Sequence, residues 1–264
     1  MALHVATYGD KSAPAIVFLH GGSISGWMWN RQIAAFRDYY CIVPDLPEHG
    51  KSITEQPITI VDCANRIAEL IQNQAVGRKA HIIGHSLGAK IIVEILSRHP
   101  DVVDHAIIVS ALFRPIPFLK LAFNRFAFKS SVLMLKSQQI LAYQVKQFGF
   151  KEENERKCLM EDFRLTTVDQ LEHVCGELYK HLKLPEHLES ASAPALVIAG
   201  EMEPVAMRES VKNISAALKN AKGILFRGCK HDIPWKSADA FNQTVREWLS
   251  DKPLTSQAIL PIKQ

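Results

Sequence analysis

Short apolar segments alternate with longer amphipathic segments along roughly the first hundred residues of the chain. The apolar segments, rich in β-branched residues, cover 15–20, 41–45, 81–84 and 106–110. Each is apolar throughout, which is typical of a strand covered on both faces in a parallel sheet. Two segments between them, 59–75 and 87–99, have the apolar spacing of helices. This order predicts an α/β fold, a mostly parallel sheet flanked by helices.

The alternation stops after Phe113 and resumes near residue 193. In between there is no strand pattern, and helical spacing recurs at 132–146 and 168–182. Beyond it, strands are expected at 195–200 and 223–226, and helices at 205–218 and 237–249. The pattern therefore predicts one α/β core, residues 1–112 and 193–264, interrupted by a helical insertion at 113–192. The tail from 252 to 264 is expected to be a loose end.

Composition and charge narrow the functional classes. The 264 residues are 47% hydrophobic and 22% charged, as in an ordinary folded protein. A net charge of +4 is too small to indicate nucleic acid binding by itself. The N-terminus lacks a secretory-signal pattern, and the longest apolar run is too short for a transmembrane segment. The five cysteines form no CxxC pair, which favours reduced thiols in a cytoplasmic protein and excludes a zinc ribbon.

The sharpest chemical signal is Gly84-His85-Ser86-Leu87-Gly88, which matches G-x-S-x-G and joins a predicted strand to a predicted helix. A tight turn there exposes the Ser86 hydroxyl at the carboxyl end of the strand. The start of the helix then offers the Leu87 amide to an oxygen that gains negative charge. The pattern predicts a nucleophilic serine.

A second glycine-rich segment, His20-Gly21-Gly22-Ser23, follows the first predicted strand. Acyl transfer needs two amide donors on one developing oxyanion, and a loop without side chains lets its backbone approach the substrate. Gly22 is the predicted second donor, with Ser23 as the alternative. Neither this segment nor the GKS at 50–52 has the glycine spacing of a phosphate-binding loop.

A serine nucleophile requires a base that takes its proton and an acid that orients the base. Among eleven histidines, His231 stands out because it lies between the last predicted strand and the last predicted helix. Glu203, three residues beyond the strand at 195–200, is the predicted acid. Glu201 and Asp232 remain open as alternatives.

In these motifs the chain resembles the α/β-hydrolase superfamily. HGG at 20–22, GHSLG at 84–88, an acid and a histidine follow in the order of that family. The resemblance covers roughly residues 3–112 and 193–250, and it implies that the insertion is the variable cap of the family. Glu203 departs from the commoner Asp, and the PEHG at 47–50 departs from the usual loop.

The resemblance implies a serine esterase that cleaves small to medium apolar acyl esters through an acyl-enzyme on Ser86, with no metal or organic cofactor. The substrate is a small molecule, expected to contact Gly21, Ser23, Trp27 and His85. Alternatives with the same residues are a thioesterase, lactonase, acyltransferase or C–C bond hydrolase or lyase, and a non-catalytic receptor also remains open. The phenylalanines at 118, 123, 126 and 128 are expected to pack between cap helices. Two alternatives remain open: these side chains line an acyl pocket, or they lie on an anionic membrane surface.

Overall fold

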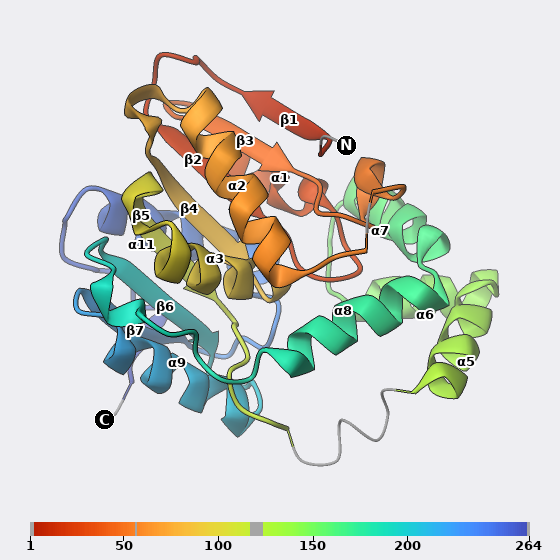
Figure 1. Ribbon diagram of the computed structural model, residues 1–264. Helices are drawn as coiled ribbons and strands as arrows, with labels where there is room; N and C mark the ends of the chain where they lie inside the picture. The colour runs from red at the N-terminus through yellow and green to blue at the C-terminus, as the bar shows by residue number, and fades with distance from the viewer. Residues whose placement is uncertain (1–2, 56, 117–123, 263–264) are drawn as a thin grey trace.

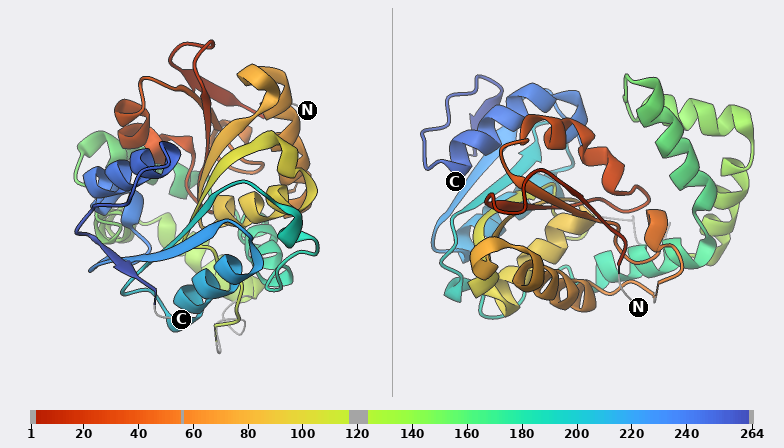
Figure 2. Two further views of the ribbon diagram at one scale, coloured as in Figure 1. Left: turned by 90° about the vertical axis from the view of Figure 1, so that its left-hand side faces the viewer. Right: turned by 90° about the horizontal axis from the view of Figure 1, so that it is seen from above.

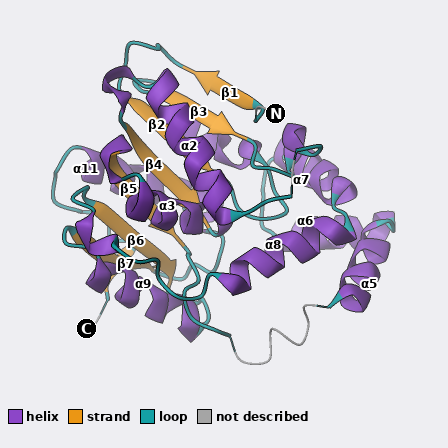
Figure 3. Cartoon of the chain, in the orientation of Figure 1, coloured by secondary structure: helices purple, strands orange, loops and turns teal. Residues whose placement is uncertain are grey.

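The computed structural model describes residues 3–55, 57–116 and 124–262. At its centre is an eight-stranded sheet with the order β1-β3-β2-β4-β5-β6-β7-β8 (Figures 1 and 3). Its strands are β1 (Val5–Tyr8), β2 (Ala15–Leu19), β3 (Tyr40–Pro44), β4 (Ala80–His85), β5 (Val103–Val109), β6 (Ala195–Gly200), β7 (Ala221–Phe226) and β8 (Ile259–Pro261). All pairs from β3 to β7 are parallel, while β1 and β8 are antiparallel edges. The predicted fold class is confirmed.

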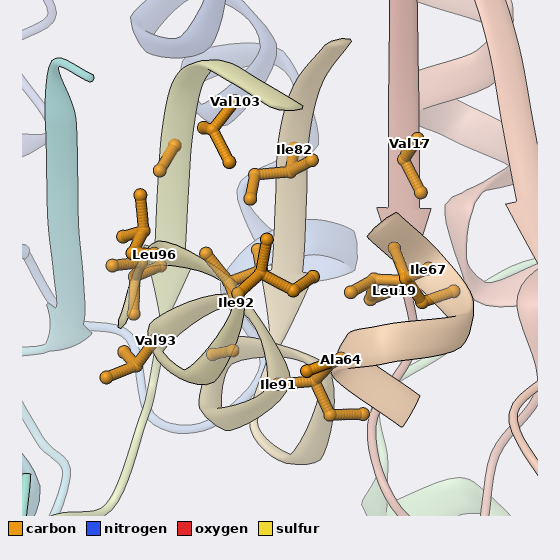
Figure 4. Packing of buried hydrophobic residues seen from close by; sticks show 14 of the residues in the cluster. Val17, Leu19, Ala64, Ile67, Ile82, Ile91, Ile92, Val93, Leu96 and Val103 are labelled. Atoms are coloured by element: carbon orange, nitrogen blue, oxygen red, sulfur yellow. The ribbon is translucent and has the colours of Figure 1, made fainter. Parts of the chain in front are cut away.

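Helices cover both faces of this sheet, as the uninterrupted apolar strands require. Within β2, Val17 and Leu19 pack in one buried cluster, whereas Ile16 and Phe18 pack in the other. The first cluster contains α2 (Ile60–Gln74), α3 (Leu87–Arg98) and α9 (Val205–Ala217), and the second contains α1 (Asn30–Ala35), α10 (Ile233–Lys236) and α11 (Ala238–Leu249). Figure 4 shows the apolar side chains of α2 and α3 against β2, β4 and β5. Each fully buried aliphatic side chain contributes about 1.5–3 kcal/mol to folding.

Between β5 and β6 the described chain forms a group of helices beyond the carboxyl ends of the strands (Figures 1 and 2). These are α5 (Arg125–Leu135), α6 (Gln138–Gln147), α7 (Glu153–Leu165) and α8 (Val168–Lys180), called the helical insertion below. The single helix predicted over 132–146 is wrong, because Ser137 adopts an extended conformation and separates α5 from α6. Serine is a favoured residue immediately before a helix, so a new helix begins there although the apolar spacing continues.

The two edge strands were not predicted. The expected loose end at 252–264 is wrong for Ile259–Pro261, which pairs with β7 as β8. The backbone N–H of Arg227 also donates to the carbonyl of Ala258, next to this pairing. Such short strands have too few residues to show a period of two, and backbone pairing with a neighbouring strand defines them. Within the described ranges, no helix has both the length and the apolar character needed to cross a bilayer.

Candidate active site

Ser86 lies at the sharp turn between β4 and α3. Its φ of 53° and ψ of −106° are strained for a residue with a side chain, and its N–H donates to the Val109 carbonyl over 2.8 Å. The flanking glycines make the turn possible. A Cβ on Gly84 would lie 2.6 Å from the backbone of Gly88, and one on Gly88 would lie 2.3 Å from the Leu19 carbonyl oxygen. The turn therefore requires glycine at both positions.

The HGG segment lies directly beside this turn. A Cβ on Gly21 would be 3.6 Å from the Ser86 Cβ, and the N–H of Gly88 donates to the carbonyl of His20. The segment follows β2, which is the neighbour of β4 in the sheet, and the helices after these strands cover opposite faces. A crevice opens at such a switch point in an open α/β sheet. Leu87 is the first residue of α3, so its N–H precedes the helical hydrogen bonds and can bind an anion there.

Two buried histidines fix the HGG segment. His20 donates from Nδ1 to the Gly21 carbonyl, and its Nε2 accepts from the N–H of Leu46. His49 donates from Nδ1 to the Pro47 carbonyl, and its Nε2 accepts from the N–H of Ser23 over 3.0 Å. Burial lowers the pKa of His49 to about 3, which keeps its ring neutral and its Nε2 able to accept. Ser23, whose φ is 59°, is therefore held in place through its backbone N–H.

Glu203 and His231 form a direct hydrogen bond. The Nδ1 of His231 lies 2.6 Å from Oε1 of Glu203, whose residue is only 4% exposed. The other oxygen, Oε2, accepts from the N–H of Gly200 and from the hydroxyl of Ser110 at the end of β5. A carboxylate with all these donors is well placed to orient the imidazole and to stabilise its protonated form.

The two alternative acids are engaged in their own loops. Glu201 accepts the N–H of Gly228, and Asp232 accepts the N–H of Lys230. Ser110 was not singled out from the sequence. The one sequence feature that marks Ser110 is its position at the end of a strand, between the nucleophile and the acid along the chain. Serines at strand ends are too common for this feature to be decisive.

His85 connects the serine turn to His231. Its Nε2 donates to the His231 carbonyl over 3.0 Å, and the two rings lie 4.5 Å apart. The ring is 3% exposed and also packs edge-on against Trp235. Among the described side chains, Ser86 has no direct hydrogen bond to His231, which is a common state of such pairs in ligand-free sites.

The helical insertion contacts the loops around this site. The carboxylate of Asp162 on α7 accepts from the Trp27 indole, the Ser25 hydroxyl and the Ser25 N–H. Burial raises the pKa of Asp162 to about 6, although these donors oppose the shift. On α8, Val174 lies so close to Gly22 that a Cβ there would approach it to 3.0 Å.

The predicted cap phenylalanines differ in their surroundings. Phe128 is 8% exposed, as expected for a packing residue, whereas Phe126 is 81% exposed. Residues 118 and 123 lie outside the described part of the chain. An aromatic side chain that the sequence analysis did not single out, Phe150, stacks on Trp235 and lies 5.1 Å from Trp27.

Known proteins resemble the chain at several levels. Residues 16–244 match the model of the alpha/beta hydrolase family. Carboxylesterase YbfK of Bacillus subtilis is 35% identical over 112 residues, which cover 40% of this chain and 37% of that protein. A 2-hydroxy-6-oxononadienedioate/2-hydroxy-6-oxononatrienedioate hydrolase of Paraburkholderia phymatum is 25% identical, covering 92% of this chain and 90% of that one.

A solved structure shows the same fold over almost the whole chain. MGS-M2, an alpha/beta hydrolase from a Medee basin deep-sea metagenome library, superposes with a TM-score of 0.77 at 18% identity. The alignment covers 97% of this chain and 96% of that one. By contrast, the chain spans about a third of the length of the first curated relatives, 34% and 37%.

Proposed function

The chain belongs to the alpha/beta hydrolase family, and from that premise we propose that it is a serine hydrolase of carboxylic esters with small to medium apolar acyl groups. Ser86 is the nucleophile, His231 the general base and Glu203 the acid that orients the base. The hydrogen bond of 2.6 Å between His231 and Glu203, beside a strained serine turn, is the observation that carries the proposal.

The proposed reaction has two half-reactions. The Ser86 hydroxyl attacks the ester carbonyl carbon while its proton passes to Nε2 of His231. The tetrahedral intermediate collapses, the C–O bond to the alcohol breaks, and the departing alkoxide takes the proton from His231. Water then attacks the acyl-enzyme, giving its proton to His231, and collapse of the second intermediate releases the acid and restores the Ser86 hydroxyl.

Each tetrahedral intermediate carries a negative oxygen that needs preorganised donors. The amide of Leu87 at the start of α3 is proposed as one donor and the amide of Gly22 as the other. The proximity of Gly21 to Ser86 and the two histidines that fix the segment support this pairing. Removal of one such donor costs about 10²–10³-fold in turnover.

Four further residues were expected to contact substrate. Gly21 and Trp27 keep that role in the proposal, because Gly21 adjoins Ser86 and Trp27 lies beneath the helical insertion. His85 is proposed instead as a positioning residue, since it is buried and holds the backbone of His231. Ser23 is proposed to act through its backbone, which is bound to His49.

A serine-reactive phosphonate and a chromogenic short-chain ester test the proposal together. Wild-type protein should be labelled on Ser86, and Ser86→Ala should lose label and about 10⁴–10⁶-fold in turnover with its fold intact. Ser97→Ala, on the same helix, is the matched control and should keep both. Turnover by Ser86→Ala at the wild-type rate would reject the assignment, and labelling without turnover would favour a receptor.

Hydrolysis of a C–C bond by the same residues is the second candidate. The relative from Paraburkholderia phymatum, named for a hydroxy-oxo dienedioate substrate, aligns with nearly the whole chain. Comparing kcat/KM for such a dienedioate with that for the short-chain ester separates the two. A dienedioate preference of about 10³-fold or more, equal to about 4 kcal/mol of transition-state stabilisation, would replace the ester assignment.

A further inference from the structure

Three potential metal ligands meet at the opposite end of the sheet from Ser86. His81 lies at the start of β4, and Asp104 and His105 lie near the start of the adjacent β5. The Nδ1 of His81 is 3.4 Å from one oxygen of Asp104, and the Nδ1 of His105 is 3.7 Å from the other. One ligand atom from each residue lies within 4.8 Å of the others.

An irregularity in strand pairing brings these side chains together. Ala80 pairs with Val103, but Ile82 pairs with Ala106, so β5 has one more residue than β4 in this interval. Successive side chains of a regular strand point to opposite faces, whereas a bulge sets two residues against one. Asp104 and His105 therefore both lie opposite His81.

The two imidazoles are buried and incompletely satisfied. His81 is 6% exposed and His105 is 8% exposed. The Nδ1 atoms of both rings are buried and make no hydrogen bond within the described structure. A buried polar atom left unpaired destabilises the fold, so two such atoms beside one carboxylate point to a ligand that binds them.

A divalent transition-metal ion satisfies all three groups. Bonds of about 2.1 Å to imidazole and carboxylate in a tetrahedron place the ligand atoms about 3.4 Å apart. His81 and His105 approach different oxygens of Asp104, at 3.4 and 3.7 Å, and the three ligand atoms lie within 4.8 Å of one another, so side-chain rotation brings them to that spacing around an ion. Two imidazoles and one carboxylate suit Zn²⁺ and are poor ligands for Mg²⁺ or Ca²⁺, which prefer oxygen.

The surroundings of the three ligands supply a supporting hydrogen bond and an access route for the ion. Asp251, in the loop after α11, lies 3.5 Å from Nε2 of His105, so it accepts that N–H and leaves Nδ1 free to bind a metal. Carboxylates commonly support metal-binding histidines in this way. A second cavity, of about 410 Å³, lies on another part of the surface. The cavity at this site has a volume of about 340 Å³ and reaches His81 and Asp104. Lys79 also lines the latter cavity and opposes a cation there, while Asp104 and Asp251 favour one.

We propose that His81, Asp104 and His105 bind one Zn²⁺ ion, with water in the fourth position. Ser86 is five residues farther along the chain, just beyond the end of β4, which at about 3.3 Å per residue is about 17 Å away. The ion therefore joins β4, β5 and the segment after α11 without touching the proposed active site. Its role is structural and independent of the proposed ester hydrolysis.

Titration of metal-free protein with Zn²⁺, followed by calorimetry and elemental analysis, tests the site. Wild-type protein should bind one Zn²⁺ per chain and unfold at a higher temperature when Zn²⁺ is present. Asp104→Asn should abolish both effects, and it should fold as wild type does because its side chain is 54% exposed. Asp251→Asn should weaken binding about 10–100-fold, the usual effect of losing such a support. Asp101→Asn, an exposed carboxylate nearby, should behave as wild type.

Co²⁺ provides a geometric readout on the unaltered protein. A site with these ligands and one water should give the intense visible bands of tetrahedral Co²⁺, and Zn²⁺ should displace them. Equal Zn²⁺ affinity in wild type and Asp104→Asn, absence of binding to wild type, or a six-coordinate Co²⁺ spectrum would overturn the proposal. Ester turnover should be the same with and without Zn²⁺, so failure here leaves the active-site proposal unaffected.

Discussion

Glu203 has both carboxylate oxygens engaged, one by His231 and the other by Gly200 and Ser110. In Glu203→Gln the amide nitrogen must face either the imidazole or these donors, so one set of hydrogen bonds is lost. The imidazole then loses its preferred tautomer and orientation. We expect kcat for a short-chain ester to fall by about 10⁴-fold, as in other triads that lose their carboxylate charge.

Asp232→Asn is the matched control for this change, because Asp232 adjoins His231 but binds the backbone of Lys230. Its kcat should stay close to that of wild type. If Asp232→Asn lost as much as Glu203→Gln, the acid would have to be reassigned. Circular dichroism of both variants establishes that each is folded.

The strained backbone of Ser86 gives a second prediction at this scale. A φ of 53° with a ψ of −106° costs about 1–3 kcal/mol for a residue with a Cβ and almost nothing for glycine. Ser86→Ala and Ser86→Gly both lose the hydroxyl, but only the glycine relieves the strain. Because glycine also loses about 0.5–1 kcal/mol of unfolded-state entropy relative to alanine, we expect a net gain of about 1 kcal/mol. Urea unfolding measures the difference, and an alanine variant of equal or greater stability would show that the strain in the turn is no larger than the entropy cost of glycine.

The sequence alone could predict the site residues whose chemistry depends on the geometry of the neighbouring chain. Ser86 stands out because glycines two positions away on each side are required by the turn. Asp162 and Ser110 could not be found in this way. Their partners are distant in the chain, Trp27 for one and Glu203 for the other, and no local pattern encodes such a contact.

At the scale of elements, Lys90 on α3 binds the chain on both sides of the helical insertion, before α5 and after α8. Its buried ammonium donates to the carbonyl of Leu112, just after β5, and to that of His181, at the end of α8. It also lies 4.1 Å from the centre of the Phe113 ring. Burial lowers the pKa of Lys90 to about 7, whereas the carbonyls and the ring favour its charged form.

Lys90→Met should loosen this attachment, because two carbonyls lose their donor at a cost of about 1–3 kcal/mol each. We expect faster hydrogen–deuterium exchange in α5 and α8, with exchange in β4 and β5 unchanged. Lys222→Met, an exposed position on β7, is the control and should leave all rates unchanged. Equal acceleration across the sheet and the insertion would show that Lys90 stabilises the whole fold instead.

Whether an element could be predicted from the sequence depends on what stabilises it. The six parallel strands and their helices are buried on broad apolar surfaces, so their residues carry a clear period. β1 and β8 are short edges defined by backbone pairing, and the boundary between α5 and α6 depends on one extended residue, Ser137. Neither backbone pairing nor a single extended residue produces a pattern of apolar positions in the sequence.

At the scale of the whole molecule, acidic residues of α7 attach the helical insertion to the core. Arg31 on α1 forms a bidentate ion pair with Glu155, with distances of 2.7 and 2.8 Å, and also donates to the carbonyl of Trp235. About two turns farther along the helix, Asp162 binds Trp27 and Ser25. The strength of attachment therefore depends on the protonation of a buried carboxyl group.

Asp162 makes the stability of the molecule depend on pH in a direction opposite to that of most carboxylates. The unfolded chain releases this proton near the ordinary pKa of 3.8, whereas burial raises the pKa to about 6 in the folded protein. The folded state binds more protons in this interval, so the stabilisation is complete below pH 3.8 and is lost as the pH rises through about 6. The shift corresponds to at most about 3 kcal/mol, less the part screened by solvent.

Asp162→Asn removes this titration while its side-chain oxygen still accepts from Trp27 or Ser25. Between pH 4 and 7 the free energy of unfolding of wild type should therefore fall relative to that of Asp162→Asn, by about 2–3 kcal/mol. Other carboxylates titrate in both proteins and cancel in the difference. Urea unfolding at several pH values measures it, with Glu161→Gln, the exposed neighbour, as control. A difference that stays constant across this range would mean that Asp162 is already ionised at pH 4, and that its hydrogen bonds outweigh its burial.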